Sequence, residues 1–505
     1  MNTSLPFPVL TADEAAEHIH HGMTLGFSGF TPAGAVKAVP AALAGRARRL
    51  HAAGEPFRIR MLTGASTGAD FDDRLAEAEA IAWRAPYQSS PPLRRRINAH
   101  ETQFVDMHLS HVPQMIAFGF FGRIDVAVVE ALDVTRDGRV YLTTSVGASP
   151  TFLRHADRVI IEVNRHTSKR LWEMHDIAIL PPPPHRNPIP IHHPLGRMGV
   201  PFAAVEPHRI MGIVETDAPD GVGAFDAPDA TSRRIAEHVV AFLMDEMRAG
   251  RIPPDFLPLQ AGVGNIANAV MAGLGESDVP DFYMYTEVLQ DAMIDLMAQG
   301  RLLGASTSAL TLSDAQMLRV YDEMEYFAPR IVLRPQELSN HPGVIRRLGV
   351  ISINTALEAD IYGNVNSTHV AGTQLMNGIG GSGDFVRNAY LSIMVCPSTA
   401  KGGRISTIVP MVSHTDHNEH SLQILVTEHG LADLRGKGPI ERARTIIDTC
   451  ADPAYRDYLR EYVDTAPLGH IRHDLGRCFE LHRNLLEHGA MLPEVGAGAG
   501  RTQWS

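Results

Sequence analysis

The sequence predicts an α/β protein made of two similar open sheets flanked by helices. Short apolar runs of strand length alternate with helix-like patterns along the chain. The order of strands, glycine loops and helices in the first half recurs in the second half. A chain of 505 residues is also too long for a single hydrophobic core. We therefore expect two α/β domains, residues 1–220 and residues 221–505.

The first half begins with a capping box formed by Thr11 and Glu14, which predicts a helix to about His21. Glycine-bearing loops follow the first two predicted strands, at 28–34 and 63–68. The strands that we expect in this half are 23–27, 58–62, 125–130, 140–143 and 159–163.

The segment 181–194 is rich in proline and cannot form regular structure, so we expect a surface loop or a domain connection there. The second half then opens with a long helix, capped by Asp229 or Thr231 and closed by Gly250. A glycine loop again follows the first strand, at 261–266. The strands that we expect in this half are 256–260, 282–285, 350–354, 365–367, 391–395 and 422–426.

Composition and charge argue against several classes of function. The net charge of −12 argues against nucleic acid or an anionic membrane as the main partner. The three cysteines are far apart and odd in number, which fits a reducing cytoplasm without a disulfide framework. The chain start lacks the basic and apolar regions of a signal peptide, and no apolar run approaches the roughly 18 residues of a membrane span. We expect a cytoplasmic protein.

Glu287 lies where a predicted strand gives way to a predicted helix. Residues 282–285 are short, apolar and aromatic, as in a buried strand of a parallel sheet, and the spacing from Val288 to Met297 is typical of a helix. Ligands of open α/β sheets bind outside the carboxyl ends of the strands. Glu287 is therefore either an acid that orients a ligand or a nucleophile, and its position leaves both open.

Two glycine loops leave more than one ligand open. Residues 262–267 follow a strand, open a helix and precede an acid by about 20 residues, as in the dinucleotide fingerprint, and residues 378–383 also match GxGxxG. An NAD site, a phosphate-binding loop at a helix N-terminus and simple close packing all fit these glycines. Asp384, Glu428 and Asp433 are further acids near glycines.

Two other clusters carry residue types that bind ligands. Lys401 lies beside flexible glycines, which suits a phosphate or a solvated loop. Residues 414–417 have metal-binding residue types, but no second cluster has matching spacing, so we expect no metal site.

Taken together, several long motifs resemble one family, the acetyl-CoA hydrolase/transferase group of class I CoA-transferases. The resemblance is nearest to the succinyl-CoA:acetate CoA-transferase type of acetic acid bacteria. It runs in order over nearly the whole chain. The motifs that carry it are Ser28–Thr31, Thr63–Gly68, Gly262–Val270, Tyr285–Asp291, Glu358–Thr368, Met376–Phe385, Ser398–Gly403 and Thr427–Gly436.

The resemblance implies two NagB/RpiA/CoA-transferase-like domains with the active site between them, and a homodimer. It places the family's nucleophilic glutamate on Glu287, with Asn340 beside it and Glu428 as a supporting acid. It places the amides of the oxyanion hole on Val263 and Gly381. Thr31, Ser66 and Thr67 are candidate contacts of the substrate carboxylate. The CoA contacts fall on Gly262, Val263, Gly264, Asn265, Ile266, Leu357, Asn377, Gly381 and Lys401.

The implied function is the transfer of CoA between short-chain carboxylates, with succinyl-CoA and acetate as the expected pair. The implied path is ping-pong, through an acyl-glutamyl anhydride and a glutamyl-CoA thioester, with CoA as substrate and without a metal or a tightly bound cofactor. An acetyl-CoA hydrolase using the same glutamate is the alternative. From other classes, an NAD-linked dehydrogenase and a non-catalytic CoA or nucleotide sensor stay open. Residues 217–224 are acidic where nearer relatives carry arginines, which bears on the binding of CoA phosphates or a diacid.

Overall fold

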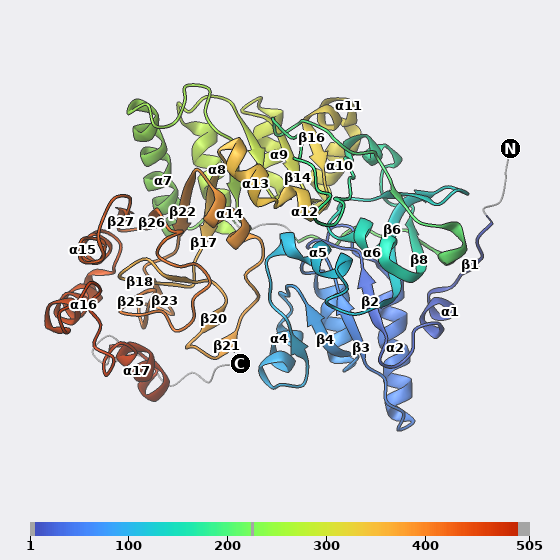
Figure 1. Cartoon of the computed structure of the whole chain (residues 1–505), viewed down its shortest axis with the longest axis horizontal. Coiled ribbons are helices and arrows are strands. Elements are labelled where there is room, and N and C mark those ends of the chain that lie inside the picture. Colours follow the sequence, from blue (N-terminus) through green and yellow to red (C-terminus); the bar gives the residue numbers. More distant parts are fainter. Residues whose placement is uncertain (1–5, 224–226, 493–505) are drawn as a thin grey trace. The chain divides into compact units, whose positions relative to one another are not determined.

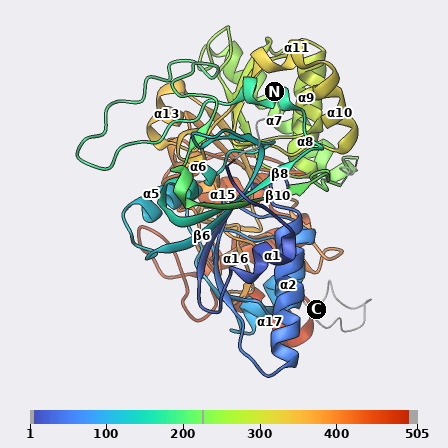
Figure 2. The ribbon, with the colours of Figure 1, turned by 90° about the vertical axis from the view of Figure 1, so that its right-hand side faces the viewer.

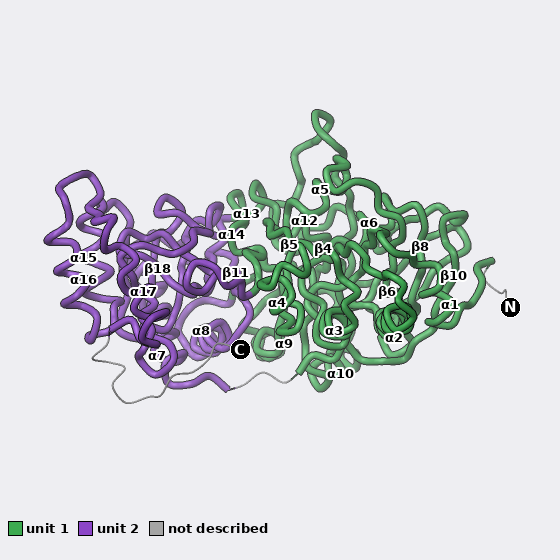
Figure 3. Tube along the Cα trace, turned by 90° about the horizontal axis from the view of Figure 1, so that it is seen from below, with its two compact units in different colours: residues 1–225, 282–348, 377–384 green, residues 226–281, 349–376, 385–505 purple. Residues whose placement is uncertain are grey.

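The computed structural model describes residues 6–223 and 227–492 (Figure 1). The chain consists of two compact units. Unit 1 consists of residues 1–225, 282–348 and 377–384, and unit 2 consists of residues 226–281, 349–376 and 385–505 (Figure 3). Both units are α/β with mostly parallel sheets, so the predicted fold class is confirmed. The units interleave in sequence, whereas the expected domains were continuous, and the division at residue 220 stays a prediction.

Unit 1 contains a large sheet with the strand order β1-β10-β8-β6-β2-β3-β4-β5. Neighbours along this path are parallel. Off this path, β7 pairs antiparallel with β6, and β9 pairs antiparallel with β7. The strands are β1 (Val9–Leu10), β2 (Thr24–Phe27), β3 (Ile59–Leu62), β4 (Ile81–Ala85), β5 (Gln103–Phe104), β6 (Ile124–Val134), β7 (Arg139–Leu142), β8 (Ala156–Asn164), β9 (Ala203–Ala204) and β10 (Ile210–Thr216).

The helices on this sheet bury short aliphatic and aromatic side chains against it. Thr11 and Glu14 form the predicted capping box, although the helix ends at Glu17 rather than near His21. Helices α1 and α2 lie side by side (Figure 2), and their buried side chains share one hydrophobic cluster with residues of the sheet. The helices are α1 (Ala12–Glu17), α2 (Ala38–Ala52), α3 (Arg74–Glu77), α4 (Pro91–Asn98), α5 (Val112–Ala117) and α6 (Ser149–His155), with a short π-helix at Ala69–Asp73 and 3₁₀ helices at Leu109–His111, Lys169–Met174 and Pro207–Arg209.

The second part of unit 1 carries Glu287. Strands β16, β14 and β12 are parallel neighbours, and the short strands β13 and β15 pair with each other. The strands are β12 (Phe282–Tyr285), β13 (Val288–Leu289), β14 (Leu302–Thr307), β15 (Ala309–Leu310) and β16 (Ile331–Leu333). The helices are α9 (Asp291–Ala298), α10 (Asp314–Asp322), α11 (Met324–Phe327), α12 (Gln336–Ser339) and α13 (Pro342–Leu348), with a 3₁₀ turn at Ala328–Arg330.

The helix expected from Val288 begins three residues later, at Asp291. Val288 and Leu289 form β13 instead, because they pair with β15, which lies about 20 residues further along the chain. Long-range pairing therefore overrides the local helical spacing here. Glu287 lies between two strands rather than directly before a helix.

Unit 2 has a sheet with the strand order β11-β17-β22-β26-β27, parallel except for the last pair. A small sheet, β19-β18-β25, and the antiparallel pairs β20–β21 and β23–β24 belong to the same unit. The strands are β11 (Leu259–Ala261), β17 (Ile351–Thr355), β18 (Glu358–Asp360), β19 (Val365–Asn366), β20 (His369–Val370), β21 (Gln374–Leu375), β22 (Leu391–Val395), β23 (Thr399–Ala400), β24 (Ile405–Ser406), β25 (Ile408–Val409), β26 (Ile424–Thr427) and β27 (Gly430–Asp433).

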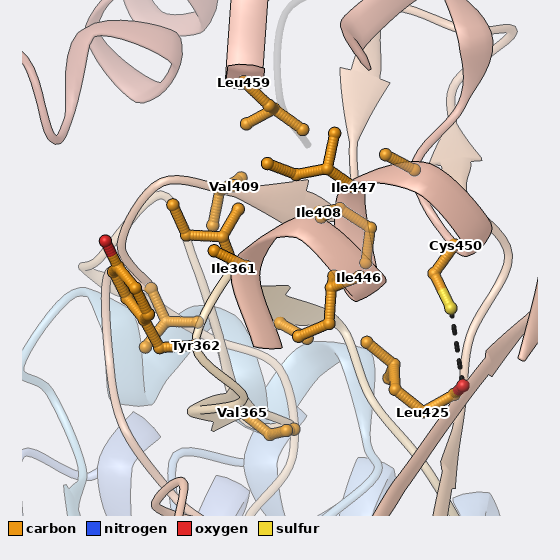
Figure 4. Packing of buried hydrophobic residues seen from close by; sticks show 14 of the residues in the cluster. Ile361, Tyr362, Val365, Ile408, Val409, Leu425, Ile446, Ile447, Cys450 and Leu459 are labelled. Carbon is orange, nitrogen blue, oxygen red and sulfur yellow. Dashed lines mark hydrogen bonds between the residues drawn. The ribbon is translucent and has the colours of Figure 1, made fainter. Parts of the chain in front are cut away.

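The helices of unit 2 cover a core of buried aliphatic and aromatic side chains, among them Ile361, Ile446 and Leu459 (Figure 4). Asp229 caps the long helix α7 as expected, because its side chain accepts the backbone N–H of Ser232 at 2.7 Å. The helices are α7 (Ala230–Arg248), α8 (Asn265–Glu276), α15 (Pro439–Thr449), α16 (Pro453–Thr465) and α17 (Glu480–His488), and α14 (Ser382–Asn388) begins in unit 1 and continues into unit 2.

The proline-rich segment 181–194 forms no helix or strand, as expected. The buried Arg334 and the exposed Arg347 hold it through its backbone carbonyls. Arg334 donates to the carbonyl of Pro194 at 3.1 Å and forms a buried ion pair with Asp176. Arg347 donates to the carbonyl of Ile189 at 2.8 Å. The segment is therefore anchored to the stretch 334–347, which also carries Asn340.

Candidate active site

The backbone of Glu287 is fixed at the end of β12. Its carbonyl accepts three hydrogen bonds: from the N–H of Ser308 at 2.8 Å, from the N–H of Ala309 at 3.2 Å and from Oγ1 of Thr307 at 2.7 Å. These donors lie at the turn between β14 and β15, and the pairing of β13 with β15 extends the same connection. The side chain of Glu287 is half-buried, so it is fixed at its base while part of it stays accessible.

Asn340 holds the carboxylate of Glu287. It follows α12, is fully buried, and its side-chain N–H donates to Oε1 of Glu287. The carbonyl oxygen of the same amide accepts the hydroxyl of Ser339 at 2.8 Å. The structure brings Asn340 and Glu287 together, although 53 positions separate them in the chain.

Gly381 lies directly against the Glu287 carboxylate. A Cβ atom built at this position would overlap the carboxylate of Glu287 and collide with Nδ2 of Asn340. Its φ angle is not in the left-handed region, so close approach alone explains the glycine here. Gly381 belongs to the loop before α14, and the structure brings it together with Glu287 and Asn340.

A second carboxylate lies near the same amide nitrogen of Asn340. Asp384, in the first turn of α14, is only 3% exposed. It accepts the backbone N–H of Ser110 at 3.0 Å and the hydroxyl of Ser110 at 2.6 Å. Nδ2 of Asn340 is 3.4 Å from Oδ2 of Asp384, so a single amide lies between two carboxylates.

Burial dominates the electrostatics of this pair. Removal from water raises the pKa of Glu287 to about 7; the hydrogen bond from Asn340 opposes the shift, and the charge of Asp384 adds to it. Burial likewise raises the pKa of Asp384 to about 7, against the hydrogen bonds from Ser110 and Asn340. Glu287 is thus a more basic carboxylate than an ordinary glutamate, and its charge depends on pH near neutrality.

The rest of the loop 377–383 packs on residues that follow β4 and β5. Nδ2 of Asn377 donates to the hydroxyl of Tyr87 at 3.1 Å. The N–H of Ile379 donates to both carboxylate oxygens of Asp106, at 2.9 and 3.0 Å. Burial raises the pKa of Tyr87, and Glu287 and Asp106 raise it further, which keeps this phenol neutral. Asn377 thus lies in the same unit and loop as Gly381.

Thr31, Ser66 and Thr67, the candidate carboxylate contacts, lie in the two predicted glycine loops of unit 1. Thr31 has a φ of +63° and shares a hydrogen bond with Thr311 through their hydroxyls. Ser66 and Thr67 are buried, and the N–H of Thr67 donates to Asp72 at 3.2 Å. Their part in substrate binding stays a prediction.

In unit 2, the loop predicted to contact CoA connects β11 to α8. The N–H of Gly262 donates to the carbonyl of Ile353 at 2.9 Å, and Gly264 has a φ of +123°. Val263 is 52% exposed, which is high for an apolar side chain. Asn265 begins α8, and Ile266 is buried beneath it. An exposed apolar loop at a helix start suits a ligand with both an apolar arm and phosphates.

The other predicted CoA contacts of unit 2 lie near turns of the small strands. Leu357 is half-buried, and its N–H donates to the carbonyl of Asn366. Lys401 is exposed at the turn between β23 and β24, with a φ of +51°. Glu428 follows β26, and its carboxylate accepts the N–H and hydroxyl of Ser398 at 2.8 and 2.5 Å. Glu428 therefore fixes the segment that leads to Lys401, and any effect on Glu287 stays a prediction.

The acidic loop before residue 224 has a structural partner. Asp220 lies 2.9 Å from Nζ of Lys37, accepts the N–H of Gly34 at 3.1 Å and accepts the hydroxyl of Thr144 at 2.5 Å. This acid neutralises a mostly buried lysine, which also pairs with Glu130 at 2.9 Å. Residue 224 of this loop lies outside the described residues.

Within the described parts of the chain, no group of three or more His, Cys, Asp or Glu side chains is placed to hold a metal ion. His414 and Asp416 are 3.3 Å apart, but Ser367 and Thr368 also donate to Asp416. A search of the same residues finds no helix with the length and apolar character needed to cross a membrane.

Comparison with known proteins identifies the family. Residues 4–215 match the acetyl-CoA hydrolase/transferase N-terminal domain, and residues 317–463 match the C-terminal domain of the same family. The chain belongs to the acetyl-CoA hydrolase/transferase family. It is an enzyme of the CoA-transferase type, as its relatives are CoA-transferases and acetyl-CoA hydrolases.

Three relatives match this chain over most of its length. The propanoyl-CoA:succinate CoA transferase of Escherichia coli (strain K12) is 56% identical and covers 96% of this chain and 98% of its own. The succinyl-CoA:acetate CoA-transferase of Clostridium kluyveri is 44% identical, over 97% of this chain and 91% of its own. The acetyl-CoA hydrolase of Schizosaccharomyces pombe is also 44% identical, over 94% of each.

Solved structures share the family's fold. RipA from Yersinia pestis superposes with a TM-score of 0.70 at 25% identity, over 90% of this chain and 96% of its own. A 4-hydroxybutyrate CoA-transferase from Porphyromonas gingivalis superposes with a TM-score of 0.61 at 22% identity, over 90% of this chain and 97% of its own. The second likeness shows the fold alone.

Sequence reasoning named Glu287, Asn340 and Gly381 but gave Ser110 and Tyr87 no part in the site. The sequence indicated Asp384 only as an acid near glycines. Ser110 lies in a short 3₁₀ turn without a motif of its own, and 274 positions separate it from Asp384. No local pattern marks such a pair.

Proposed function

We propose that this chain is a CoA-transferase that moves CoA between short-chain carboxylates, with Glu287 as the nucleophile. The observation that carries the proposal is the Glu287 carboxylate, which is accessible at a strand end, held by the Asn340 amide, and packed against Gly381. Its raised pKa makes it more nucleophilic than an ordinary carboxylate. This arrangement needs neither a metal nor a general base.

In the proposed path, an oxygen of Glu287 attacks the thioester carbonyl of the acyl-CoA, the C–S bond breaks, and CoA leaves as a thiolate. The thiolate attacks the Glu287 carbonyl of the resulting anhydride, releasing the first carboxylate and leaving a glutamyl-CoA thioester. An acceptor carboxylate then attacks this thioester, and the displaced thiolate attacks the acceptor's acyl carbonyl to give the new acyl-CoA. Each step forms an oxyanion, for which we propose the backbone N–H groups of Val263 and Gly381 as donors.

We propose succinyl-CoA and acetate as the substrate pair, because the motifs of this chain resemble those of the succinyl-CoA:acetate CoA-transferase type. The names of the E. coli and C. kluyveri relatives both include succinate or its CoA ester, which supports a four-carbon diacid as one partner. The two names differ in the other partner, which is the propanoyl group in the E. coli relative and acetate in the C. kluyveri relative. Because one methylene in a pocket changes selectivity by only about 1–3 kcal/mol, acetate and propionate must be compared directly. We further propose that CoA contacts residues 262–266, Leu357, Asn377 and Lys401. We also propose that the protein is a homodimer.

The covalent intermediate tests the proposal. The protein is incubated with succinyl-CoA or acetyl-CoA, treated with borohydride, and digested for mass spectrometry. We expect reduction of Glu287, and only of Glu287, in the presence of the CoA ester, because the glutamyl thioester is reducible and a free carboxylate is not. Protein incubated with free CoA is the control. Turnover with an unmodified Glu287 contradicts the proposal.

Activity is expected to fall on the acid side of neutrality. Because the pKa of Glu287 is raised to about 7, the carboxyl group holds its proton below that pH and cannot attack. We expect kcat/KM for the acyl-CoA to fall by about tenfold per pH unit below the pKa of this group. Initial rates across the acid range check this result. A limb near the ordinary glutamate value of 4.5 contradicts it.

Hydrolysis is the second candidate, because several relatives are named acetyl-CoA hydrolases. In that case water attacks the glutamyl thioester or anhydride in place of the acceptor acid. Loss of acetyl-CoA is measured with and without added succinate. Strong dependence on the acid supports transfer, and an equal rate in its absence supports hydrolysis. Calorimetry with NAD and with CoA separates both from the dehydrogenase, since only CoA should bind to a transferase or hydrolase. Turnover of acetyl-CoA separates both from a non-catalytic sensor.

A further inference from the structure

Asp384 is a buried carboxylate beside the proposed nucleophile, and the reaction path described above does not use it. Its carboxylate accepts both the backbone N–H and the hydroxyl of Ser110, at 3.0 and 2.6 Å. Burial of a charged group is costly unless hydrogen bonds compensate it. Ser110, itself 1% exposed, supplies this compensation from another part of unit 1. The position of Asp384 is therefore well defined.

The amide of Asn340 connects the two carboxylates and has one satisfactory orientation. Its nitrogen donates to Oε1 of Glu287 and lies 3.4 Å from Oδ2 of Asp384, while its oxygen accepts the hydroxyl of Ser339. A flipped amide would place its oxygen against carboxylate oxygens, which are acceptors only. Both carboxylates thus favour the orientation in which the N–H group faces Glu287.

The proposed reaction removes one of these two restraints. When Glu287 becomes an anhydride or a thioester, it loses its negative charge, and a neutral acyl oxygen accepts a hydrogen bond more weakly than a carboxylate. Asp384 takes no part in bond formation and remains in place. We propose that Asp384, held by Ser110, is a positioning residue that keeps the Asn340 N–H directed at Glu287 while Glu287 is acylated. This inference rests on the proposed function.

The charge of Asp384 gives the proposal a second readout. This charge is a cause of the raised pKa of Glu287, so its removal should lower that pKa. The other titratable groups near this cluster are Tyr87, whose pKa is raised, and Asp106, which binds the loop before α14. The ring of His108 lies against Gly383. None of these is changed by a substitution at position 384.

The main test is Asp384→Asn, which keeps the size of the side chain and removes its charge. Its oxygen, at the position of Oδ2, can still accept from the N–H groups of Ser110 and Asn340, but a neutral amide accepts these hydrogen bonds more weakly than a carboxylate. We expect kcat to fall by about 10- to 100-fold with little change in KM for the acyl-CoA, as for a misplaced catalytic group. We also expect the acid limb of kcat/KM to move to lower pH, which a purely structural role would not produce.

Two further sets of variants test the route through Asn340. If Asp384 acts through Asn340, the double variant Asp384→Asn/Asn340→Ala should be no slower than Asn340→Ala alone. If the loss of kcat in the double variant equals the product of the losses in the two single variants, the proposal is overturned. Ser110→Ala should lower kcat and Ser110→Thr, which keeps the hydroxyl, should restore it. This pair also carries the test if Asp384→Asn does not fold.

The borohydride trap separates this inference from the proposed function. A wild-type protein that turns over without modification of Glu287 contradicts the proposed function itself. A wild-type protein that is modified at Glu287, together with a folded Asp384→Asn variant of unchanged kcat and unchanged pH profile, overturns only the role of Asp384. Modification of wild-type Glu287 with slow turnover and a shifted acid limb in Asp384→Asn supports both.

Discussion

Replacement of Glu287 by glutamine should lower CoA transfer by about 10⁴-fold or more, the size of loss seen when a covalent nucleophile is removed. Glutamine keeps the volume of the side chain but cannot form the anhydride or the thioester. The same variant should show no borohydride-dependent modification. Initial rates of acyl-CoA formation and mass spectrometry of the digested protein measure the two effects.

Stability serves as the control for this variant. The wild-type carboxylate is destabilised by burial and by the charge of Asp384, as its raised pKa indicates. An uncharged glutamine avoids both effects, so the melting temperature at neutral pH should not be lower than that of the wild type. Transfer activity within tenfold of the wild type would show that Glu287 is not the nucleophile.

Replacement of Gly381 by alanine should reduce activity by about 100-fold or more, although it adds only a methyl group. The added Cβ would overlap the Glu287 carboxylate and crowd Nδ2 of Asn340, so both groups must move. A displacement of about 1 Å at reacting groups is enough to cost on the order of 100-fold. Steady-state kinetics should show the loss in kcat, and the trapped adduct on Glu287 should form more slowly.

Gly45→Ala is the matched control for this substitution. A Cβ at Gly45, within α2, would make only an ordinary contact with Arg49 at 3.7 Å. Alanine also has the higher helix propensity, so this variant should keep full activity and equal or greater stability. Wild-type kcat in Gly381→Ala would mean that the packing of Gly381 against Glu287 is unimportant for the reaction.

The elements that local pattern determines were predicted well from the sequence. Thr11 and Glu14 form a capping box because both groups are three residues apart, and Asp229 caps α7 for a similar local reason. The strand 282–285 was placed correctly because a short apolar run between polar ends is typical of a buried parallel strand. Glu287 at its end follows directly from that strand.

The sequence by itself thus determined the α/β class, the strand just before Glu287 and, through its long motifs, the family. Only the tertiary structure decided that Val288 and Leu289 form a strand, because their partner β15 lies elsewhere in the chain. It also decided which groups surround Glu287. Asp384 and Ser110 are 274 positions apart, and Asn340 is 53 positions from Glu287. Such contacts depend on how strands and loops pack, and the local periodicity of a sequence does not predict them.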